Sequence, residues 1–162
     1  MTEKEMFLNN WQREFGTTMK ILKSMPADKG DFKPAGEKLR TAKELATVFV
    51  LELGVIDHVV KGKIDFSGPM PSFATLGDVL NAYEGKQKEM VSKVQAMSEA
   101  DYNAKISAPV GPKQMGEVRR ADMLWLMLSD SIHHRGQFSI YLRMAGAKVP
   151  SIYGPSGDEP WN

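Results

Sequence analysis

The chain has 162 residues, of which 42% are hydrophobic and 25% charged, with no cysteine, three histidines and a formal net charge of +1. The length fits one domain with its own hydrophobic core. The missing cysteine excludes disulfides, thiolate metal sites, iron–sulfur clusters and a cysteine nucleophile, and the balanced charge argues against a nucleic-acid-binding protein. A transition-metal site must therefore use imidazole and carboxylate ligands, and the imidazoles belong to His58, His133 and His134.

Signals for export or membrane insertion are not found in the sequence. Residues 1–10 lack the apolar core of a signal peptide, and the most apolar run, residues 47–51, is followed by Glu52. We therefore expect a cytoplasmic protein with no membrane partner.

The first half of the chain carries two helical patterns. Apolar residues recur every three or four positions over residues 7–25, and Pro26 ends this predicted helix. After a loop rich in glycine and proline, Thr41 followed by Glu44 forms a capping-box pattern that begins a second helix. This helix runs to about Val60 and is apolar on nearly all sides, so we expect it to be the most buried.

The second half of the chain carries two more helical patterns. A third helix, residues 76–97, begins with the same kind of cap, and a cap-like short turn follows at residues 98–101. Residues 108–116, rich in proline and glycine, are predicted to form a crossover that could hold a short extended stretch. A fourth helix spans residues 120–146, and residues 149–162 form a tail that docking would have to order.

This pattern predicts the fold class. Four long helices without a convincing strand-like alternation favour an all-α four-helix bundle. We find no internal repeat and no linker, so we expect a single domain over residues 1–162 with a Pro/Gly-rich C-terminal tail.

Asp130 and His134 are the residues most suited to chemistry. Their i, i+4 spacing places them one turn apart on the apolar, core-facing stripe of the fourth helix. Burying both is costly unless they are paired, hydrogen-bonded or bound to a metal. Spacing alone favours a structural pair in which Asp130 accepts a hydrogen bond from His134; the alternative is that both bind one ion between helices. His133 lies about 100° around the helix and is not expected to share that ion.

Three other polar residues are predicted to have structural roles. Arg135 and Gln137 are predicted to tie the fourth helix to its neighbours, and Arg135 could pair with an acidic residue of the second helix or with the tail. His58, near the end of the second helix, is predicted to be a surface residue that compensates the helix dipole.

The segment DSIHHRGQFSIYLR, residues 130–143, followed by AKVPSIYGPSGDE, residues 147–159, resembles the DinB/YfiT-like family. The Phe32–Lys33–Pro34 loop and the Asp65–Phe66–Ser67–Gly68 turn are also similar to loops of that family. The resemblance implies a four-helix bundle of the bacterial damage-inducible type that is commonly a homodimer. It also implies metal dependence, and some of the metal-dependent relatives are transferases that use small thiols.

The resemblance implies a metal site of three histidines, with one in the second helix and a His-x-x-x-His pair in the fourth. The last histidine matches His134, the first member of the pair falls on Asp130, and the second-helix histidine falls on Val48, which is not a ligand. Glu52, one turn beyond Val48, could reach the ion by its spacing. Three imidazoles suit zinc or nickel, whereas an Asp–Glu–His set would favour manganese or iron.

Two functions remain open, and the sequence does not decide whether the protein is an enzyme. Because Val48 is not a metal ligand, the sequence favours a family member with a degenerate, metal-free site. Such a protein would be dimeric and either non-catalytic or ligand-binding. The alternative is an active divalent-metal-dependent enzyme, of the small-thiol S-transferase or hydrolase type, that uses Asp130 and His134 as ligands. Expected partners are a second copy of the chain and a small molecule or thiol in the bundle pocket. A nucleic-acid-associated stress factor is disfavoured by the net charge of +1.

Overall fold

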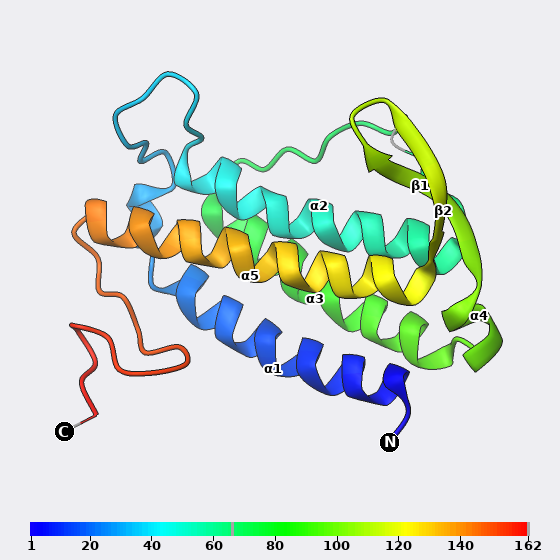
Figure 1. The fold of residues 1–162 in the computed structure, drawn as a ribbon. Coiled ribbons are helices and arrows are strands. Elements are labelled where there is room, and N and C mark those ends of the chain that lie inside the picture. The colour runs from blue at the N-terminus through cyan, green and yellow to red at the C-terminus, as the bar shows by residue number, and fades with distance from the viewer. Residues whose placement is uncertain (66, 162) are drawn as a thin grey trace.

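The structure is a computed structural model that describes residues 1–65 and 67–161; Phe66, in the family-like turn, and Asn162, the last residue of the tail, lie outside the described residues. Within this part the chain is mostly helical, with five α-helices, one short 3-10 helix and a two-stranded sheet. Figure 1 shows the four long helices, α1 (Glu3–Lys23), α2 (Ala42–Lys61), α3 (Leu76–Ala96) and α5 (Arg120–Met144).

The predicted helix starts are confirmed where a capping box marks them. In α2 and α3 the backbone N–H of the third helical residue donates to the capping threonine, from Glu44 to Thr41 and from Asp78 to Thr75, each at 3.1 Å. A further capping box at Thr2 begins α1 before the first residue of the predicted apolar stripe. These caps satisfy N–H groups that have no partner inside the helix.

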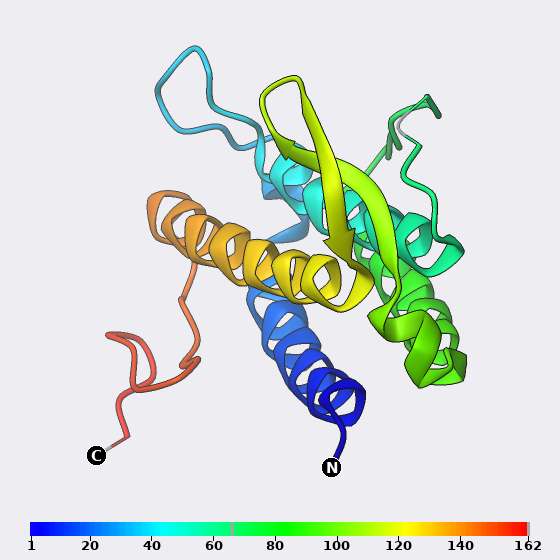
Figure 2. The same cartoon turned by 45° about the vertical axis from the view of Figure 1, so that its right-hand side comes forward.

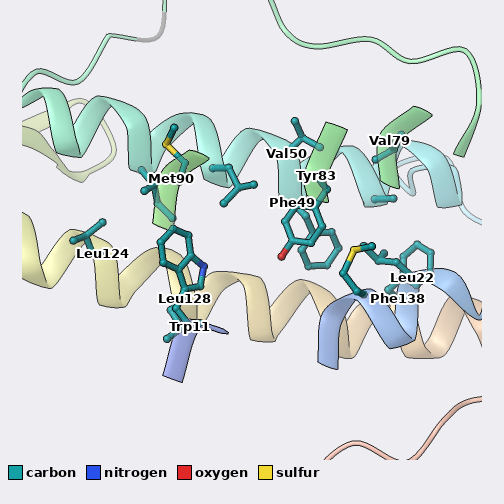
Figure 3. Close-up of a cluster of buried hydrophobic side chains, with 14 of the residues drawn as sticks. Trp11, Leu22, Phe49, Val50, Val79, Tyr83, Met90, Leu124, Leu128 and Phe138 are labelled. Carbon is teal, nitrogen blue, oxygen red and sulfur yellow. The ribbon is translucent and has the colours of Figure 1, made fainter. Parts of the chain in front are cut away.

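The long helices enclose a common core. Helix α2 packs against α3 and α5, and α1 packs against the same two helices. Figure 3 shows part of the core between them, including Trp11, Phe49, Tyr83, Leu128 and Phe138. No helix of the described part is both long and apolar enough to span a bilayer.

Helices α2 and α3 run parallel although they are consecutive. Lys43, near the start of α2, donates to the Ala74 carbonyl just before α3 at 3.1 Å, and Lys93, near the end of α3, pairs with Asp57 at 2.8 Å. The connection between them therefore returns along the outside of the helices, as Figure 1 shows. Glu52 and Tyr83 consequently lie at similar heights in the core, with Phe49 against Tyr83.

The all-α prediction is wrong between α4 (Glu99–Asn103), which occupies the predicted short turn, and α5. Strands β1 (Lys105–Gly111) and β2 (Gln114–Arg119) pair antiparallel, and Figure 2 shows this hairpin leading into the first turn of α5. Only Ile106 and Ala108 of β1 are buried, so the alternation was too short to recognise. A register irregularity between Pro109 and Gly111 accommodates the residues that resemble strand breakers.

The segment after α5 is fastened to the helices by its acidic residues. Asp158 accepts hydrogen bonds from the Val149 backbone at 2.9 Å and from Arg143 of α5 at 2.6 Å. Glu159 accepts one from Lys20 of α1 at 2.8 Å. The segment is therefore held against two helices despite its prolines and glycines.

Candidate metal centre

Glu52, Asp130 and His134 meet where α2 faces α5. The Nδ1 atom of His134 lies 2.8 Å from Oε1 of Glu52 and 3.7 Å from Oδ1 of Asp130. One ligand atom from each residue lies within 4.8 Å of the other two. The fold thus brings Glu52, which spacing alone suggested, to the two residues of the α5 stripe.

The cluster is buried on one side and open on the other. The side chain of Glu52 is 7% exposed and that of His134 is 14% exposed, whereas that of Asp130 is 41% exposed. Asp130 is therefore less buried than its place on the apolar stripe predicted. An ion or small molecule would approach from the side of Asp130.

The electrostatics leave the cluster short of positive charge. Burial, reinforced by the charge of Asp130, raises the pKa of Glu52 to about 8 against an opposing hydrogen bond from Ser131. Burial also lowers the pKa of His134, although the charge of Asp130 acts in the opposite direction. In the described part of the chain no lysine or arginine forms an ion pair with either carboxylate. A cation placed among the three groups would supply the missing charge.

The residues present fit a divalent ion. Two carboxylates and one imidazole form a donor set that suits manganese, iron or zinc and leaves coordination positions for water or a ligand. The fit rests on the buried, unbalanced carboxylate of Glu52 rather than on acidic residues alone, since exposed acidic groups are common without a metal. Val48, one turn before Glu52, contributes only methyl groups.

A groove lies along α2 beside this cluster. Its volume is about 600 Å³, and its lining includes Val48, Thr47, Phe73 and the cations Arg40 and Lys43. The positive charge of Arg40 contributes to the lowered pKa of His134, because it opposes protonation of the imidazole. The groove therefore combines apolar side chains with two cations and the carboxylate of Glu44.

The other two histidines differ in their distance from the cluster, since the ring of His133 lies 5.3 Å from that of His134, centroid to centroid, whereas His58 is at the far end of α2. His133 points to the exposed side of α5, where its Nε2 atom lies 2.7 Å from the amide nitrogen of Gln137. His58 sits in the last turn of α2 and accepts a hydrogen bond from the Asp65 backbone at 3.3 Å. Neither histidine belongs to the group formed by Glu52, Asp130 and His134.

Arg135 belongs to a second buried polar cluster. Its guanidinium donates to Glu14 of α1 at 2.8 Å and to the hydroxyl of Tyr153 in the C-terminal segment. The pairing with the tail is as predicted, but the acidic partner is on α1 instead of the second helix. Glu14 was not among the predicted site residues, although its position three residues after Trp11 places it on the buried stripe of α1.

Comparisons with known proteins identify relatives over almost the whole chain. The profile described as the DinB family matches residues 1–161. An uncharacterized protein of Bacillus subtilis (strain 168), YrdA, is 24% identical over 155 residues, which cover 94% of this chain and 89% of YrdA.

Solved structures show the same fold. A DinB-like protein from Bacillus cereus ATCC 10987 has a TM-score of 0.76 at 22% identity, with 92% of this chain and 97% of that chain covered. A DinB-like protein from Bacillus subtilis has a TM-score of 0.69 at 16% identity, with 91% and 97% covered.

Proposed function

This chain belongs to the DinB family, and from that premise we propose that it binds a divalent metal ion through Glu52, Asp130 and His134. The observation that supports the proposal is the buried carboxylate of Glu52, which faces His134 and Asp130 and has no lysine or arginine partner. Glu52 replaces the ligand that Val48 cannot provide. When bound, the ion would act as a Lewis acid on a small molecule.

The groove beside Val48 would hold that small molecule. The lining also includes the carboxylate of Glu44, and Lys43 already pairs with Asp31 at 3.2 Å, so Arg40 is the cation that favours an anionic group, while Val48 and Phe73 favour apolar contacts. We infer that the substrate is a small anionic compound, a class that includes charged thiols. The bundle of four long helices thus serves as the scaffold for a metal-dependent reaction on that compound.

Metal titration of the full chain tests the proposal. We expect saturable binding of Mn²⁺, Fe²⁺ or Zn²⁺ by isothermal titration calorimetry with one site per chain. Glu52→Gln and His134→Ala should weaken binding by more than the roughly 10- to 100-fold that loss of an outer-shell partner costs. His58→Ala is the control, because His58 lies in the last turn of α2 and is not one of the three clustered residues, and it should bind as the unmodified protein does. Absence of saturable binding by each of these ions would contradict the proposal.

A second candidate function is a metal-free, non-catalytic ligand-binding protein. It is favoured by the direct contact of 2.8 Å between His134 and Glu52, because one shared proton can satisfy both groups without an ion. Under this alternative the double variant Val48→His, Asp130→His should create metal binding that the unmodified protein lacks. If the unmodified protein already binds metal as tightly as the double variant, the metal-free alternative is wrong.

The homodimer, the single domain and the cytoplasmic location stay predictions. Light scattering coupled to gel filtration tests the first of these, with twice the mass of one chain as the expected result.

A further inference from the structure

Two lysines on the same face of α3 differ in their partners. Lys86 and Lys93 are seven residues, or two helical turns, apart. The Lys93 ammonium pairs with Asp57 of α2 at 2.8 Å and with Glu89 at 2.6 Å. Lys86 is half-buried, yet within the part of the chain that the structure describes its side chain makes no hydrogen bond and no ion pair. A cation that has lost part of its hydration in this way favours an anionic partner.

Gly54 of α2 leaves open space beside the Lys86 ammonium. A Cβ atom at Gly54 would lie 3.8 Å from Nζ of Lys86, so the ammonium lies next to the bare backbone of α2. A side chain longer than that of alanine would extend from Gly54 into the space next to the cation. The missing side chain therefore leaves room there for a group of another molecule.

Lys86 and Gly54 line a second groove, which lies between α2, α3 and the connection that joins them. Its volume is about 630 Å³, which is in the range of small-molecule sites. Val50, Leu51 and Val55 of α2 and residues 69–71 of the connection form an apolar part of the lining. The groove thus combines an apolar surface with one unpaired cation.

The other polar groups of this lining already have partners. The Asp65 carboxylate accepts a hydrogen bond from the Ser67 backbone N–H at 2.9 Å, and the Asp65 backbone N–H donates to His58 at 3.3 Å. Asp65 is the one carboxylate among the described residues of the lining, and it forms no ion pair with Lys86. The Lys86 ammonium is therefore open to a carboxylate from outside the chain.

We propose that this second groove binds a small amphipathic carboxylate, such as a medium-chain fatty acid. Its carboxylate pairs with Lys86 in the space above Gly54, and its hydrocarbon part packs against Val50, Leu51 and Val55. Burial of the hydrocarbon supplies most of the affinity, and the ion pair fixes the orientation. The site shares no residue with the candidate metal centre, so it goes beyond the proposed function and does not depend on it.

Titration of the full-length protein with octanoate, followed by ¹H–¹⁵N spectra with a chelator present, tests the proposal. We expect saturable shifts that are largest for residues 50–55 and Lys86. Octanamide is the matched ligand, because it has the same chain without the charge. Lys86→Met should lower octanoate affinity about fivefold, as expected for loss of a partly exposed ion pair, and leave octanamide affinity within about twofold.

Matched variants separate the site from general effects on α2 and α3. Lys88→Met is the control for Lys86→Met, because Lys88 already pairs with Glu84 at 3.0 Å, and it should bind octanoate as the unmodified protein does. Gly54→Leu should abolish binding of both ligands by filling the groove. Gly85→Leu, at a glycine of α3 with no atom near its missing Cβ, should not. Both glycine variants introduce a better helix former, so the fold should persist, and thermal unfolding checks this.

Several outcomes would overturn the inference. Absence of saturable octanoate binding contradicts it, as does an equal loss for Lys86→Met and Lys88→Met. A loss for Arg40→Met as large as that for Lys86→Met would place octanoate in the groove beside Val48 instead. A dimer that Gly54→Leu dissociates and Gly85→Leu does not would show that a second copy of the chain covers the groove. Because the chelator removes metal ions, failure of octanoate binding leaves the proposed metal site untouched, and failure of Mn²⁺ binding leaves this site untouched.

Discussion

Glu14 on α1 and Glu52 on α2 are two buried glutamates in one core, and their surroundings are opposite. They are 4% and 5% exposed. Glu14 receives hydrogen bonds from Arg135 and Tyr153, whereas Glu52 faces an imidazole and the carboxylate of Asp130.

The pKa values of the two glutamates reflect this difference. Burial by itself raises the pKa of Glu14, but the hydrogen bonds from Tyr153 and Arg135 outweigh it and lower the pKa below its ordinary value. The pKa of Glu52 is raised to about 8 because nothing comparable offsets its burial. Equal burial thus produces a completed ion pair in one place and, in the other, a carboxylate that contacts an imidazole but has no lysine or arginine partner among the described residues.

The largest expected effect comes from removing the positive charge that completes the cluster around Glu14. Arg135→Met leaves Glu14 buried without its cation, so the free energy of unfolding should fall by about 3–5 kcal/mol in urea titrations. Arg143→Met on the same helix is the control, because the partner of Arg143 is Asp158 in the half-exposed C-terminal segment. A loss as large for Arg143→Met as for Arg135→Met would contradict the distinction between the two.

The cluster around Glu52 should make the free energy of unfolding depend on pH. Folded Glu52 titrates near pH 8 and unfolded glutamate near 4.5, so the native state holds the extra proton between these values and stability falls as pH rises. Between pH 6.5 and 8.5, with chelator present, the unmodified protein should lose about 2 kcal/mol that Glu52→Gln does not lose. The lowered pKa of His134 places its opposite contribution at more acidic pH, where stability is lost as pH falls.

Glu14→Gln is the counterpart in this experiment. Because the pKa of Glu14 is lowered, its contribution is present above the ordinary value and is lost only as pH falls toward the acid range. This variant should therefore keep the downward slope between pH 6.5 and 8.5. A flat profile for Glu14→Gln would show that Glu52 is not the source of the slope.

Metal affinity should depend on pH in the same window. Glu52 must lose its proton to bind an ion, so apparent Mn²⁺ affinity should fall about tenfold for each pH unit below 8. Calorimetry at several pH values measures this. An affinity that is constant between pH 6 and 8 would mean that Glu52 is not a ligand.

The smallest expected effect is at the tail. Tyr153→Phe removes one hydroxyl from the Glu14 cluster and should cost about 1 kcal/mol, because Arg135 still pairs with the carboxylate. Faster amide exchange in the C-terminal segment should accompany the loss. Stability equal to that of the unmodified protein would show that the tail does not contribute to the cluster.

The local elements were largely predictable. Capping pairs such as Thr41 with Glu44 act within four residues, so sequence locates them without knowledge of the fold. The β-hairpin was missed because only Ile106 and Ala108 are buried in β1 and the neighbouring prolines and glycines resemble a loop. The spacing of Asp130 and His134 on one helix was similarly local, and the structure places both at the cluster.

The amino-acid sequence by itself determined the helices, the absence of cysteine ligands and nucleophiles, and the placement of Asp130 and His134 one turn apart. Only the tertiary structure decided that Glu52 meets them and that Glu14 pairs with Arg135. The reason is physical: a helix sets which of its own residues share a face, but contacts between helices depend on how their axes pack. The free energy of a buried charge depends on those contacts, and it differs between Glu14 and Glu52 for that reason.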